Sequence, residues 1–249
     1  MISNRTIGEI DRTNQTSDTS QRKAAIAAGL GLLLMIIPAI FANFVVVQNL
    51  LVPGDASATA ANILANELQF RLGILSFIIV IILDVVVAWA LYVFFKPVNK
   101  SLSLLTAWFR LVYSAIFAVA LFDLLNALRL VSDADYSALF ETDQLHSQVM
   151  LSLNAYSDGW TLGLIFFGLH LVLLGYLVFK SGFMPKVLGI LVIIAGAGYL
   201  IDSFGGLLLP DFGLAIGQFT FIGELLLALW LLIKGLNAKA WAETAPETA

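Results

Sequence analysis

The chain has no cysteine, few charges and no known catalytic motif. The absence of cysteine from its 249 residues excludes a disulfide framework, a thiolate nucleophile and a cysteine-ligated metal. The two histidines and scattered carboxylates are too few to predict a metal site. The sequence also lacks a GxSxG elbow, an HExxH pair and a P-loop, so it indicates no enzyme class, and we expect neither a cofactor nor a metal ion.

Apolar residues dominate what is present. They make up 60% of the chain, charged residues make up only 12%, and the mean hydropathy is +0.93. This composition is outside the soluble globular range and predicts an all-α, polytopic membrane protein. Six apolar runs, each long enough to cross a ~30 Å hydrocarbon core, predict six transmembrane helices at residues 24–47, 70–95, 101–127, 157–180, 187–209 and 213–235.

The domain organisation follows from these runs. One six-helix bundle takes up residues 22–236, and the polar tails 1–21 and 237–249 are expected to be disordered because they cannot bury enough apolar surface to fold. Pro38 predicts a kink in the first span. A signal peptide ending near Ala42 is an alternative, but the polar leader is long for one and the apolar run continues through Val47.

The basic residues predict the orientation. Because positive residues stay on the cytoplasmic side, both termini are expected to be cytoplasmic, in the plasma membrane of a bacterium, with the lipid bilayer as partner and no nucleic acid. The sequence leaves open whether the chain forms a homo-oligomer. The residues that mark this side are Arg22, Lys23, Lys96, Lys100, Lys180, Lys186, Lys234 and Lys239.

Two outer loops have helical patterns of their own. Asp55 is placed to cap a helix that runs into the second span. In residues 136–156, apolar positions recur at helical spacing against Glu141, Asp143 and His146, which predicts a short helix lying in the outer interface.

Four ionisable residues share one depth near the middle of the bilayer. Each lies about ten residues, or ~15 Å, from the cytoplasmic end of its span; they are Asp84, Arg110, His170 and Glu224. A charge at the midplane costs roughly 2.5–3.5 kcal/mol on insertion scales, so these side chains are expected to meet inside the bundle. They are our candidate binding residues for a small solute, an ion or a proton.

The hairpin through Pro97 brings Asp84 level with Arg110 and predicts an ion pair. That pair can also serve only to lock two helices together. Glu224 continues a small, polar helix face through Gly217 and Thr220, which either lets another helix approach closely or lines a path to the carboxylate. His170 could bond a neighbouring helix, or could meet Glu224 as a proton-exchanging pair.

A second layer lies nearer the outer surface. Its candidate vestibule residues are Arg71, Asp123, Tyr199 and Asp202. Three functions remain open for the chain: a protein that binds or passes a small solute, ion or proton; an intramembrane lipid-modifying enzyme that uses His170 and a carboxylate; and a non-catalytic membrane scaffold. A protein that passes a solute would show a water-filled path to both faces of the membrane, and an enzyme would show a pocket open to lipid. A scaffold would show an interior whose polar groups are all paired.

Several phrases resemble one family. VPGDA, FRLV, FFGLH and GYLIDS are similar to the bacterial integral membrane proteins grouped as domain of unknown function 4386, and the resemblance extends over about residues 22–236. It implies a prokaryotic multi-pass membrane protein. It implies no substrate and no activity.

The orientation can be tested by labelling, because the chain has no cysteine background. With both termini cytoplasmic, an impermeant thiol reagent added outside should label Ser137→Cys and spare Asn99→Cys. The reverse pattern would refute the orientation.

Overall fold

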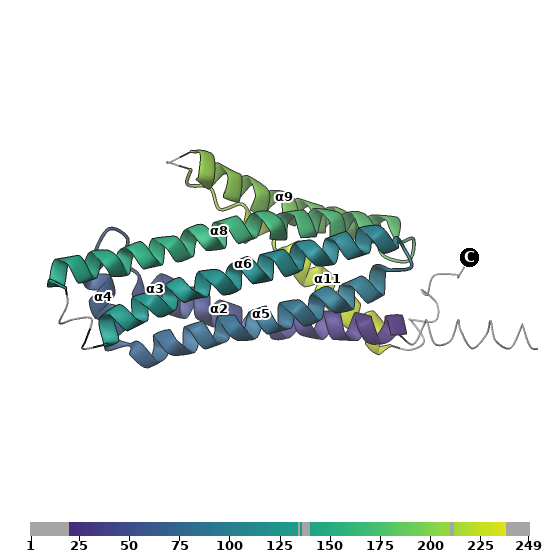
Figure 1. The fold of residues 1–249 in the computed structure, drawn as a ribbon. Coiled ribbons are helices and arrows are strands. Elements are labelled where there is room, and N and C mark those ends of the chain that lie inside the picture. Colours follow the sequence, from purple (N-terminus) through teal and green to yellow (C-terminus); the bar gives the residue numbers. More distant parts are fainter. Residues whose placement is uncertain (1–19, 134, 136–139, 210–211, 238–249) are drawn as a thin grey trace, which may run out of the picture.

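The computed structural model describes residues 20–133, 135, 140–209 and 212–237, and within them every regular element is a helix. The predicted tails lie almost wholly outside the described residues. The helices run roughly along one axis and form an elongated bundle (Figure 1). The all-α prediction is confirmed.

The elements follow the apolar runs. The first span is helical over Ser20–Leu50 and includes α2 (Ile36–Ile40), the π-helix η1 (Phe41–Val47) and α3 (Gln48–Leu50). The others are α4 (Ala56–Ala65), α5 (Glu67–Phe95), α6 (Lys100–Ser132), α8 (Thr142–Lys180), α9 (Lys186–Leu208), α10 (Gly217–Thr220) and α11 (Ile222–Leu236).

Five of the described helices are long and apolar enough to cross a membrane. The segment expected to be the sixth span, 213–235, instead contains two helices that meet at Phe221, and the longer, α11, has 15 residues. The count of six transmembrane helices therefore stays a prediction. Arg22 Nε donates to Gly235 O at 2.8 Å, so the first span begins at the end of the bundle where α11 finishes. Figure 1 shows both at that end.

The first span is irregular around Pro38. The α-helix is interrupted at Met35, and the chain continues as the π-helix η1. Proline lacks the N–H that the i−4 carbonyl requires, and π-turns accommodate such disruptions. The helix is therefore irregular on both sides of Pro38, where a kink was predicted.

The outer loops differ from their predictions. Asp55 does cap α4, since its Oδ1 accepts from Ala58 N at 2.8 Å, but α4 ends at Asn66, whose non-helical backbone (φ −124°, ψ 37°) separates it from α5. No separate interfacial helix forms over 142–156, because this part of the expected segment begins α8; residues 136–139 lie outside the described chain. Val149 and Leu153 are buried, which holds the extension on the bundle.

The extension makes α8 longer than a membrane is thick. At ~1.5 Å per residue, its 39 residues span about 58 Å, against a hydrocarbon core of ~30 Å. The bundle therefore projects beyond the bilayer at the end where α4 lies (Figure 1).

Glycines bring α8 and α9 into backbone contact. A Cβ built on Gly196 would lie 2.7 Å from Gly168 O and 2.8 Å from Val172 N, and a Cβ on Gly189 would lie 2.7 Å from Gly175 O. Both contacts are with backbone atoms, which cannot give way as a flexible side chain can. These paired glycines fix α9 against the helix that carries His170.

We expect Gly196→Ala to destabilise the protein by about 1–3 kcal/mol, as overpacking does. Unfolding in detergent, followed by tryptophan fluorescence, would measure the change. Gly206→Ala on the same helix is the control, because its Cβ would meet nothing within 4 Å. Equal stability of the two variants would contradict the close contact.

Candidate functional site

Arg110 is at the centre of the candidate site. It is the largest fully buried side chain of the described residues, with 1% of its surface exposed, and it forms an ion pair with Asp84 of α5, which is equally buried. The predicted pair between these two helices is confirmed. Three further polar side chains of α6 also face the interior, because Ser103, Thr106 and Ser114 are all buried.

His170 contacts the same arginine. Its Nε2 lies 3.2 Å from Arg110 Nη1, and its Nδ1 lies 2.8 Å from the Thr106 carbonyl oxygen. A guanidinium can only donate and a carbonyl can only accept, so these partners assign the proton to Nδ1 and the lone pair to Nε2. The imidazole is therefore neutral and fully engaged. It binds α8 to α6 at two points.

Two further residues surround the guanidinium. Arg110 Nη2 donates to Met35 Sδ of the first span at 3.8 Å, and the Phe167 ring centroid lies 5.4 Å from Arg110 Cζ. The Phe167 ring also contacts Tyr199 of α9 in a T-shaped arrangement, with the centroids 5.4 Å apart. Phe167 thus separates the arginine cluster from Tyr199.

The sequence analysis missed Met35 and Phe167. Phe167 could have been found, because it precedes His170 by three residues and so lies on the same face of the helix. Nothing in the sequence singles out Met35 among the apolar residues of the first span.

Glu224 lies on the far side of Phe167, in the first turn of α11. The Tyr199 hydroxyl is close enough to hydrogen-bond with its carboxyl group, and the charges of Arg110 and Asp84 act on it. Its Oε1 is buried and has no hydrogen-bond partner among the described residues, and Arg110 Nε is in the same condition. The predicted contact between His170 and Glu224 is not made, because both imidazole nitrogens are occupied.

The small face of the sixth segment packs against α9. A Cβ on Gly217 would come within 2.9 Å of Tyr199 Cδ1. Of the two interpretations of this stripe, the structure therefore supports close helix approach at Gly217, and the same approach brings Glu224 to Tyr199.

The four outer-layer residues do not form one group. Arg71 pairs with Glu67 at 2.6 Å on the surface of α5, where such a pair contributes little. Asp202 accepts from Ile216 N at 2.9 Å and from Gly217 N at 2.6 Å, and so caps α10. Tyr199 belongs with Glu224, and Asp123 is partly buried on α6. A vestibule role for these residues stays a prediction.

The charge balance limits what the site can bind. Asp84 and Arg110 compensate each other and His170 is neutral, so an ionised Glu224 gives the cluster a net charge of about −1. A bound anion would add to this negative charge, because the guanidinium of Arg110 already pairs with Asp84. A proton or a small cation would remove the uncompensated charge. In the described part of the chain, no three His, Asp or Glu side chains gather into a group able to hold a metal ion.

Comparisons with known proteins identify a family without an assigned activity. The family model "Domain of unknown function (DUF4386)" matches residues 27–235, which confirms the resemblance found in the sequence. An uncharacterized protein of Archaeoglobus fulgidus is 43% identical over 162 residues, which cover 65% of this chain and 83% of that protein. No solved structure matches.

The ion pair can be measured with a double-mutant cycle. Either Asp84→Asn or Arg110→Gln should cost about 3–5 kcal/mol, because each leaves the other charge buried without its partner. The double variant should lose less than the sum of the two. Strictly additive losses in unfolding free energy would mean that the two side chains do not interact.

Proposed function

We propose that this chain, which belongs to the family of domain of unknown function 4386, binds a proton at Glu224 within the membrane and couples it to the passage of a small solute or ion. The observation that carries the proposal is the buried Glu224 Oε1, which finds no hydrogen-bond partner in the part of the chain that the structure describes; Arg110 Nε is in the same condition. Buried polar atoms are almost always satisfied by protein, water or a ligand. A buried carboxylate oxygen without a protein partner supports a proton or a water molecule being held at Glu224.

The position of Glu224 at the start of a helix supports this function. Glu224 lies in the first turn of α11, directly after the turn at Phe221, and its backbone N–H donates to Phe221 O at 2.9 Å. The positive end of the α11 dipole can stabilise its carboxylate when the proton leaves.

The two alternatives fit less of the site. A lipid-modifying enzyme would need His170 as an acid–base group, but both of its nitrogens are engaged with Thr106 and Arg110. A scaffold accounts for the Asp84–Arg110 pair. It does not account for the unpartnered oxygen of Glu224.

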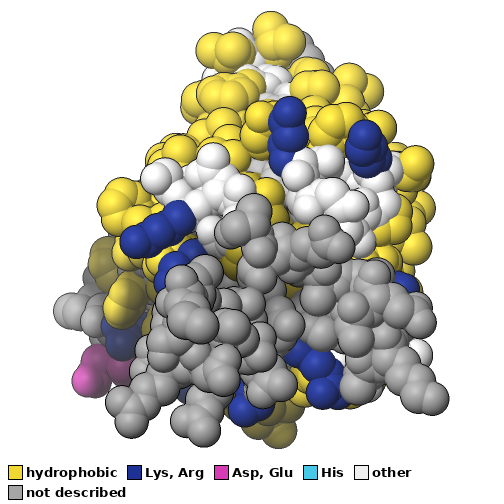
Figure 2. Space-filling view, turned by 90° about the vertical axis from the view of Figure 1, so that its right-hand side faces the viewer, with side chains coloured by type: hydrophobic (Ala, Val, Ile, Leu, Met, Phe, Trp, Pro, Cys, Tyr) yellow, Lys and Arg dark blue, Asp and Glu magenta, His cyan; other side chains and the backbone are white. Residues whose placement is uncertain are grey.

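For the location, we propose a prokaryotic cell membrane with both termini in the cytoplasm. Figure 2 shows Lys and Arg side chains at the end of the bundle where the first span begins and α11 ends. Because Lys and Arg residues stay on the cytoplasmic side of a membrane, this end of the bundle is expected to face the cytoplasm.

Infrared difference spectroscopy would test the proton site directly. In the wild type reconstituted in lipid nanodiscs, we expect the band of a protonated carboxyl group to change between about pH 4 and pH 9, the range in which perturbed carboxyl groups titrate. Glu224→Gln should remove this band and leave the fold intact, since an uncharged amide is easier to bury than a carboxylate.

Glu67→Gln is the matched control, because Glu67 is a partly exposed carboxylate that pairs with Arg71 on the surface. It should retain the band. A spectrum unchanged by Glu224→Gln would end the proposal. If Glu224→Gln proteoliposomes also lost pH-dependent solute uptake, that result would support the second part of the proposal, the coupling of proton binding to solute passage.

A further inference from the structure

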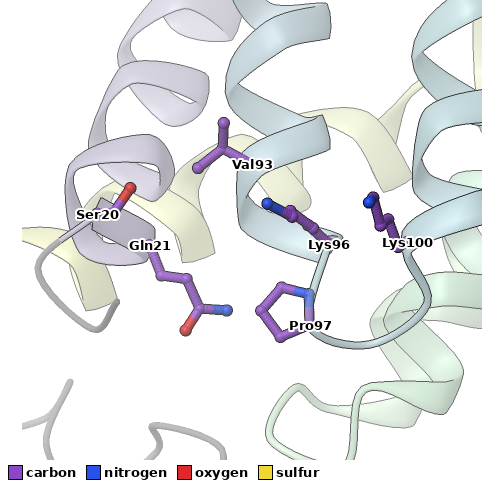
Figure 3. Close-up of a pocket in the computed structure, with 6 residues that line it drawn as sticks. All are labelled: Ser20, Gln21, Val93, Lys96, Pro97 and Lys100. Carbon is purple, nitrogen blue, oxygen red and sulfur yellow. The ribbon is translucent and has the colours of Figure 1, made fainter. Parts of the chain in front are cut away.

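A cavity of about 320 Å³ lies at the basic end of the bundle, and the residues that line it are far from Glu224 in the sequence. It is formed between the start of the first span and the turn that joins α5 to α6 (Figure 3). Six residues line it: Ser20, Gln21, Val93, Lys96, Pro97 and Lys100. Neither the resemblance nor the candidate site assigns a role to this cavity.

The charges of the cavity all have one sign. Lys96 and Lys100 both line it, no Asp or Glu does, and neither lysine takes part in an ion pair between described residues. The α6 helix begins at Lys100, with Asn99 Oδ1 capping Leu102 N at 2.9 Å, so the positive end of its dipole adds to the same field. An anion is the complementary ligand.

One wall of the cavity is held in place. Gln21 has 4% of its surface exposed and donates from Nε2 to Phe94 O at 3.1 Å. This bond ties the first span to the end of α5 across the cavity. The wall that Gln21 forms is therefore part of the packed structure.

The position of the cavity indicates the source of the anion. It lies where α5 ends at Phe95 and α6 begins at Lys100, the level at which membrane helices reach the lipid headgroups. Val93 and Pro97 give it an apolar side beside the ammonium groups. Its volume is at the small end of ligand pockets, roughly 300–1,000 Å³, which suits a headgroup better than a whole lipid.

We infer that this cavity binds the phosphate group of an anionic phospholipid from the membrane leaflet at the basic end of the bundle. The two lysines hold the phosphate as point charges, and the apolar side accepts the glycerol and the first part of an acyl chain. The inference is independent of the proton site, because none of the cavity residues belongs to the Arg110 cluster.

Native mass spectrometry of the purified full chain would test this inference. Detergent-solubilised protein is given phosphatidylglycerol, phosphatidylcholine or inorganic phosphate in separate arms. The wild type should retain phosphatidylglycerol in preference to phosphatidylcholine, and Lys96→Gln with Lys100→Gln should reduce this preference about tenfold or more, as expected for two basic residues near a membrane surface.

The control removes two charges from the same end but outside the cavity, through Lys180→Gln with Lys186→Gln. These lysines lie over the rings of Tyr176 and Phe179. The control should keep the preference within about twofold. An equal loss in both double variants would mean a diffuse surface charge and would overturn the assignment.

The phosphate arm distinguishes the two sources. If inorganic phosphate alone binds the wild type and not the Lys96→Gln, Lys100→Gln variant, the cavity takes a phosphate from solution and not from lipid. If neither phosphate nor phosphatidylglycerol distinguishes that variant from the wild type, the cavity holds no phosphate and the inference is wrong.

Discussion

The burial of Arg110 constrains the rest of the structure. A guanidinium is always charged, and with 1% of its surface exposed it must find its partners within the bundle. Four helical segments supply them: Asp84 from α5, the Thr106 carbonyl of its own helix acting through His170, His170 and Phe167 from α8, and Met35 from the first span. Removing α5 would leave the charge without its counter-ion, and removing α8 or the first span would take away a polar or ring contact, so the arginine links all these helices.

This constraint explains why the histidine is a structural residue. In another setting, an intramembrane imidazole is a candidate proton carrier. Here the arginine takes its lone pair and the Thr106 carbonyl takes its proton. Protonating His170 would place a second cation against the guanidinium, a like-charge contact with no water to screen it. Among the four residues of this layer, Glu224 is therefore the one that fits the proton exchange we propose.

The sequence predicted the features that follow from periodicity and depth. Helix positions along the apolar runs, the cap at Asp55 and the Asp84–Arg110 pair all depend on spacing along one or two adjacent segments, which a single sequence contains. The contacts it did not predict depend on the rotation of helices far apart in the chain. Whether His170 faces Arg110 or Glu224 depends on how α8 is rotated relative to α6 and α11, and depth alone does not give that rotation.

The sixth segment was predicted as one span because hydropathy does not detect an interruption. Residues 213–235 contain no proline, yet helix begins only at Gly217, where the chain contacts another helix. Asp202 of α9 accepts from the backbone of Ile216 and Gly217 and so fixes where α10 begins. A cap placed by another helix is a tertiary interaction, absent from the segment's own sequence.

The arrangement separates a rigid part of the site from an adjustable part. Asp84, Arg110 and His170 join α5, α6 and α8 through direct contacts, so a change among them would disturb three long helices at once. Glu224 lies near Tyr199, which contacts Phe167 of the cluster, and it belongs to the short helix α11. A change of charge at Glu224 therefore acts first on α10, α11 and their contacts with α9. The Asp84–Arg110 pair itself is charge-balanced, so Glu224 is the residue of this layer whose protonation would change the net charge.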